Sequence, residues 1–125
     1  MVIGILQFEL FIHDAESLKD KRRVVKSVKD RLHREHLVSV AEVAAQETLN
    51  AAVLGLALVG SDGVYVGRVL DQITAKLRST PGAVLGECTR EVIHGSQLPD
   101  RAEPEPDDEA IAREMLARFD EPESP

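Results

Sequence analysis

Residues 2–12 read "VIGILQFELFI", and large apolar side chains recur at nearly every even position of this stretch. The even positions carry Val2, Gly4, Leu6, Phe8, Leu10 and Ile12. A period of two with β-branched residues is typical of a strand that buries one face. We therefore predict a strand over residues 2–12, with its even-numbered side chains in the core and its odd-numbered side chains on the opposite face.

A basic helix is predicted directly after this strand. Ser17 followed by Asp20 resembles a capping box, and the helical pattern runs from Leu18 to about His36. Its apolar side is formed by Leu18, Val25, Val28 and Leu32, with Val24 at the edge. Lys21 also falls on this apolar side. We expect its stem to lie on the core and its ammonium group to reach water.

Three further segments have the composition of strands. They are residues 37–43, 51–59 and 83–93, of which the second is aliphatic on both faces. Residues 44–50, between the first two of these strands, either extend a strand or form an exposed turn.

A second amphipathic helix is predicted between the last two strands. The turn "GSDG" at residues 60–63 offers Ser61 or Asp62 as its N-cap, and the helix ends near "STPG" at residues 79–82. Its apolar positions follow the helical period and are Val66, Val69, Leu70, Ile73 and Leu77.

The element order is strand, helix, strand, strand, helix, strand, which predicts the ferredoxin-like βαββαβ fold of the α+β class. Right-handed crossovers leave few competing topologies. We expect one domain over residues 1–95, with a four-stranded antiparallel sheet and both helices on one face of it.

Charge is unevenly distributed along the 125 residues, whose net charge is −7. Residues 1–98 carry 12 basic and 12 acidic side chains, whereas residues 99–125 carry 3 basic and 10 acidic ones. Within the neutral part, residues 19–34 hold eight bases against only two acids. The chain therefore combines a concentrated basic segment with an acidic one.

The Pro-containing acidic stretch over residues 96–125 predicts a disordered tail. Within it, residues 108–119 place Ile111, Met115 and Phe119 on one side of a short helix. So short a helix is unstable alone in water, so it is expected only against a surface that buries these side chains.

Three motifs resemble one known family. "MVIGIL…EL" at the N-terminus, "SLKDKRRVVKSVKDRL" at residues 17–32 and "VSVAEV" at residues 38–43 are similar to the YlxP-like family, a bacterial domain of unknown function. The resemblance covers about residues 1–94. It implies a ferredoxin-like fold. It also implies a gene beside those for translation initiation factor two and ribosome-binding factor A, which points to ribosome assembly or translation.

The basic helix is the candidate binding surface. Projected at about 100° per residue, six cations fall within a sector of about 140°; they are Lys19, Arg22, Arg23, Lys26, Lys29 and Arg34. Such a stripe suits a polyanion, because Lys and Arg displace counterions from phosphates. We expect a non-enzymatic module that contacts ribosomal RNA or the small ribosomal subunit.

Two other interpretations of the basic helix remain open. The stripe is either a solvated helix face without a partner, or it binds acidic protein surfaces as part of a structural or regulatory interaction module. The chain's own acidic tail is one such surface, since tethering raises its effective concentration.

The exposed sheet face is the second candidate surface. It carries Ile3, Ile5 and Phe11 together with aliphatic residues of the strand at 51–59, more apolar surface than a monomer usually leaves wet. We expect a homodimer to cover it, with the tail helix as the alternative. The whole chain has three Phe, one Tyr and no Trp, so base stacking on this sheet is not expected.

Several other functions are not expected. The longest apolar stretch, residues 51–60, is half the length that crosses a bilayer, and the N-terminus lacks the features of a signal peptide, which predicts a cytoplasmic protein that does not contact membranes. The single cysteine, Cys88, excludes an internal disulfide. His33 and His36 are three residues apart, but a metal there would need more ligands and would meet cationic neighbours. With no nucleophile–base set in the sequence, we expect no metal, cofactor, small-molecule substrate or enzymatic activity.

Overall fold

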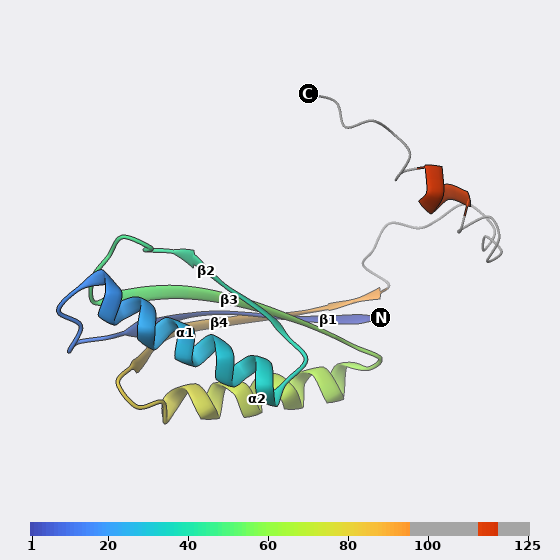
Figure 1. Ribbon diagram of the computed structural model, residues 1–125. Coiled ribbons are helices and arrows are strands. Elements are labelled where there is room, and N and C mark those ends of the chain that lie inside the picture. Colours follow the sequence, from blue (N-terminus) through green and yellow to red (C-terminus); the bar gives the residue numbers. More distant parts are fainter. Residues whose placement is uncertain (96–112, 118–125) are drawn as a thin grey trace.

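The computed structural model describes residues 1–95 and 113–117 (Figure 1). Its elements are β1 (Val2–Phe11), α1 (Leu18–Glu35), β2 (Ser39–Ala44), β3 (Ala51–Gly60), α2 (Gly63–Arg78) and β4 (Val84–His94). This is the predicted order, with bounds shifted by one to two residues. The predicted tail lies outside the described residues, apart from residues 113–117, which are helical.

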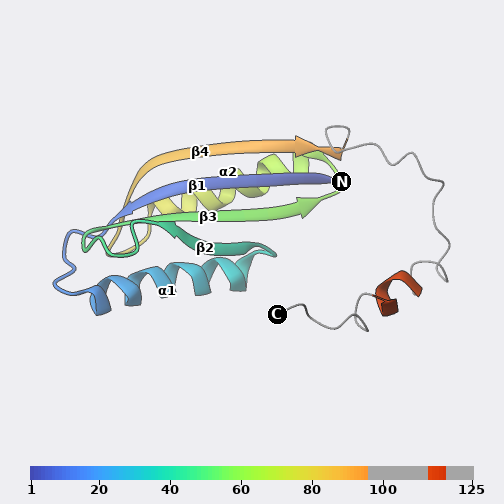
Figure 2. The same cartoon turned by 90° about the horizontal axis from the view of Figure 1, so that it is seen from above.

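The four strands form one antiparallel sheet in the order β2-β3-β1-β4. β1 is central, pairing with β3 from Val2 opposite Gly60 to Phe11 opposite Ala51, and with β4 on its other side. Both helices cover the same face of the sheet (Figures 1 and 2). The fold is ferredoxin-like, and the predicted fold class is confirmed.

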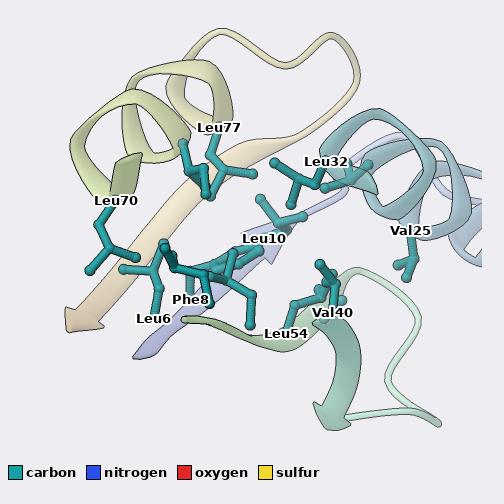
Figure 3. Close-up of a cluster of buried hydrophobic side chains, with 14 of the residues drawn as sticks. Leu6, Phe8, Leu10, Val25, Leu32, Val40, Leu54, Leu70 and Leu77 are labelled. Atoms are coloured by element: carbon teal, nitrogen blue, oxygen red, sulfur yellow. The ribbon is translucent and has the colours of Figure 1, made fainter. Parts of the chain in front are cut away.

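The core lies between the sheet and the two helices (Figure 3). Every even-numbered residue of β1 is buried, while none of its odd-numbered residues is, as the alternation predicts. Opposing side chains from β3 and the helices complete the core and include Val25, Leu32, Leu54, Leu70, Ile73 and Leu77. The helices thus bury the side of the sheet that the sequence assigns to them.

Side-chain caps begin both helices. The Ser17 hydroxyl oxygen accepts a hydrogen bond from the Asp20 amide at 3.1 Å. Asp62, one of the two predicted candidates, caps α2 by accepting from the Tyr65 amide at 2.8 Å. Each cap satisfies an amide that has no partner within its own helix. Residues 45–50 form the turn alternative, not an extended strand.

The prediction that the ammonium group of Lys21 reaches water is wrong. Among the described residues Lys21 is the only buried charged side chain, with 0% of its surface exposed, so its ammonium group does not reach water. It donates hydrogen bonds to the carbonyl oxygens of Ala45 and Gln46, and it lies 3.2 Å from Glu42 Oε2 in an ion pair. The reason is that the β2–β3 turn closes over the first turn of α1. We call this contact the Lys21 clamp.

Replacing Lys21 with Met is expected to destabilise the domain by about 3 kcal/mol, because the Glu42 carboxylate and two carbonyl oxygens lose their buried cation. Urea unfolding measures the loss. Lys19→Met is the matched control, since Lys19 is exposed on the same helix turn, and its midpoint should match wild type. Equal midpoints for the two variants would show that the clamp does not stabilise the fold.

Candidate nucleic-acid interface

The outer side of α1 brings all six predicted cations onto one surface. Val25, Val28 and Leu32 hold the opposite side of the helix in the core. Five of the cations are exposed and Lys29 is half-buried. We call this set the basic face; it comprises Lys19, Arg22, Arg23, Lys26, Lys29 and Arg34. Its ends are fifteen residues apart, about 23 Å along the helix axis.

Acidic residues neutralise the basic face only in part. Lys26 Nζ lies 2.8 Å from Asp30 Oδ2, and Arg23 lies 4.0 Å from Asp20. Both pairs are exposed, and pairs of this kind contribute little to stability. Within the described residues, the other four cations have no carboxylate within ion-pair distance.

The pKa of the Asp30 carboxyl group is lowered by the cations of this surface. The hydrogen bond from Lys26 lowers the pKa of its carboxyl group, and the charges of Lys26, Arg34 and His33 lower it further. An anion at the basic face therefore meets several cations at once.

A groove runs between α1 and the edge strand β2. Arg22, Lys26, Lys29 and His33 lie along its helical side together with Asp30, and Glu42 lines it from β2. The outer edge of β2 has no neighbouring strand in the sheet, so backbone groups face outward along this side. The sequence analysis missed the groove, although its helical residues recur at i, i+4, i+7 and i+11.

The two remaining bases of α1 have structural contacts. Lys21 forms the clamp, and Arg31 Nε lies 3.4 Å from Glu35 Oε1. Glu35 also pairs with Lys76 of α2, whose ammonium lies 2.8 Å from His36 Nε2. This network joins the end of α1 to α2. Within the described residues, by contrast, the six cations of the basic face form no ion pair with another element of the fold.

The histidine of this network is held neutral. Burial lowers the pKa of His36, and the neighbouring Lys76 charge lowers it further, although Glu35 acts in the opposite direction. The hydrogen bond from Lys76 lowers the pKa of Glu35, which keeps that carboxylate ionised. A neutral imidazole can accept the Lys76 hydrogen bond through Nε2.

His36 makes stability pH-dependent. Because its folded-state pKa lies below the ordinary 6.5, the unfolded chain binds more protons, and stability falls as pH drops through 6.5. Urea midpoints between about pH 7.5 and 5.5 should decrease for wild type and change less for His36→Gln, whose amide does not titrate. His33→Gln, on the exposed side of α1, should behave as wild type. The same decrease in all three proteins would contradict this assignment.

The open sheet face has a different character. Gln7, Glu9, Glu87 and Thr89 line a shallow hollow on β1 and β4. Ile3 and Ile5 are half-buried on this face. The half-buried Phe11 stacks on His13, with ring centroids 6.0 Å apart, and covers Gly86. Carboxylates and few rings make this face a poor surface for stacking RNA bases.

The described residues offer few groups for metal binding or nucleophilic catalysis. They contain no group of three or more His, Cys, Asp or Glu side chains placed to hold a metal ion. Burial raises the pKa of the half-buried Cys88 thiol, which disfavours a nucleophilic thiolate. No described helix is long and apolar enough to span a bilayer.

Residues 3–90 match the family model described as a protein of unknown function, DUF503. The chain belongs to this family. A similar relative is the uncharacterized protein YlxP of Bacillus subtilis (strain 168), 35% identical over 80 residues, which are 64% of this chain and 87% of YlxP. The resemblance drawn from the Ser17 motif is therefore confirmed. A solved structure, a de novo designed protein with ferredoxin fold, aligns with TM-score 0.45 and 16% identity over 84% of this chain and 96% of its own.

Proposed function

We propose that this DUF503 protein is a non-enzymatic RNA-binding module that contacts ribosomal RNA, in the small subunit or its precursor, through the basic face of α1. The observation that carries the proposal is a one-sided row of cations, four of which have no acidic partner within the described residues. The ribosomal assignment draws on the gene neighbourhood that the family resemblance implies.

The spacing of the basic face favours a ligand over simple solvation. Arg22, Lys26 and Lys29 follow at helical spacings of four and three, where like charges repel and destabilise a helix. A helix selected only for solvation is expected to mix both signs along its exposed side. A polyanion would relieve this repulsion, because its phosphates neutralise the cations while the counterions condensed on it are released into solution.

The chemistry of the basic face favours phosphate contacts over base contacts. α1 contains no Phe, Tyr or Trp, and its exposed cations lie on a regular helix of 18 residues. The open face of the sheet, which stacks bases in other ferredoxin-like RNA-binding domains, carries carboxylates here. Binding is therefore expected to depend strongly on salt and weakly on RNA sequence.

The double variant Arg22→Gln/Lys29→Gln tests this surface. It should weaken binding to a labelled small-subunit ribosomal RNA fragment at least about tenfold at low salt and reduce the salt slope by about 2, because two phosphate contacts are lost. Fluorescence anisotropy across a salt series measures both quantities.

Arg68→Gln/Arg78→Gln is the matched control. It removes the same charge from exposed positions on α2. Affinity and slope close to wild type are expected for this control, with circular dichroism showing that both doubles are folded. Equal losses of RNA affinity in the two double variants would show that net charge alone determines binding, which would contradict a site on α1.

The acidic tail offers a second candidate ligand for the same face. Residues 99–125 carry the whole net charge of −7, and the groove beside β2 presents three cations and His33 against the two carboxylates of Asp30 and Glu42. In this regulatory arrangement, the tail competes with RNA from a tethered position.

Deleting residues 96–125 should then raise RNA affinity several-fold at low salt, and the gain should disappear near 0.5 M salt, where such contacts are screened. In the Arg22→Gln/Lys29→Gln background the gain should shrink, because the groove no longer binds the tail. An equal gain in both backgrounds would indicate general repulsion of RNA by the tail.

A further inference from the structure

An apolar band crosses the open face of the sheet. Its side chains come from β1, β2 and β3; they are Ile3, Ile5, Ala41, Val43, Ala57 and Val59, several of which line a shallow depression. Val43 is 49% exposed and Val59 is 63% exposed. The register places Ile3 beside Val59 and Ile5 beside Ala57, so the band is continuous across neighbouring strands.

The charged residues around this apolar band limit which partner can cover it. Glu9 and Glu87 line the hollow beside it, and Glu91 lies opposite Ile5 on β4. The only lysine or arginine in the four strands is Arg90, which contacts Asp71 and Gly67 of α2 on the helical side. A face with carboxylates and no cation repels RNA, and it repels the acidic tail for the same reason.

We infer that a second copy of this chain covers the apolar band, in a face-to-face dimer whose two-fold axis runs along β3. This axis packs β3 on its counterpart, where the small, exposed Ala57 allows close approach, and leaves Glu87 and Glu91 of β4 outside the overlap. An in-plane axis across the strands would instead stack β4 on β4 and bring like charges together. Two sheets packed in this way lie about 10 Å apart.

The overlap sets the expected strength of the dimer. Three strands of up to ten residues span roughly 14 Å by 33 Å, so the interface buries on the order of 1,000 Å² in total. This area lies at the low end for specific complexes and corresponds to a dimer with a dissociation constant in the micromolar range. Because both helices cover the other face of each sheet, the dimer presents two basic faces on opposite outer sides.

Analytical ultracentrifugation of the full chain from about 5 to 500 µM tests the dimer. Wild type should shift from monomer to dimer over this range. Val43→Glu and Ala57→Glu each place a charge in the apolar band and should remain monomeric throughout. Val64→Glu is the matched control, because Val64 is 73% exposed on α2, away from the band, and this variant should dimerise as wild type does.

Thermal unfolding by circular dichroism shows which variants are folded, and either folded band variant suffices for the comparison. Wild type that stays monomeric at 500 µM would overturn the inference. So would a dimer that persists in a folded band variant, because another surface would then hold it. If the full chain stays monomeric and a variant lacking residues 96–125 dimerises, the tail covers the face instead.

Discussion

The Lys21 clamp is the constraint on which the arrangement of this domain depends. A buried ammonium group joins the first turn of α1 to Glu42 of β2 and to the carbonyl oxygens that follow it. Together with Val25, Val28 and Leu32 it fixes which side of α1 faces the sheet. Once that side is fixed, helical geometry turns the remaining cations outward and toward the edge of β2.

The bases of α1 therefore divide by role. Lys21 joins α1 to β2, and Arg31 pairs within α1 with Glu35, the residue that also pairs with Lys76 of α2. The basic face has no comparable contacts to a neighbouring element. The open face of the sheet, in contrast to the basic face, has apolar residues bordered by carboxylates. A domain that is neutral overall thus has one surface suited to a polyanion and another suited to a copy of itself.

Sequence patterns predicted most of the fold because its signals are local. The alternation in β1 and the caps at Ser17 and Asp62 depend on neighbouring residues, and the structure places them as expected. Lys21 was misjudged because a helical projection gives the direction of a side chain and not how deeply the chain covers it. The groove was missed because the distance between α1 and β2 is set by tertiary packing.

An amide NMR titration of the full chain with a small-subunit ribosomal RNA fragment tests the central claim, that the basic face is the RNA-binding surface. The account predicts saturable shift changes concentrated in residues 19–34 and along β2, with Glu87, Thr89 and Glu91 of the open face unchanged. Changes centred on β1 and β4, or no saturable change at low salt, would contradict it.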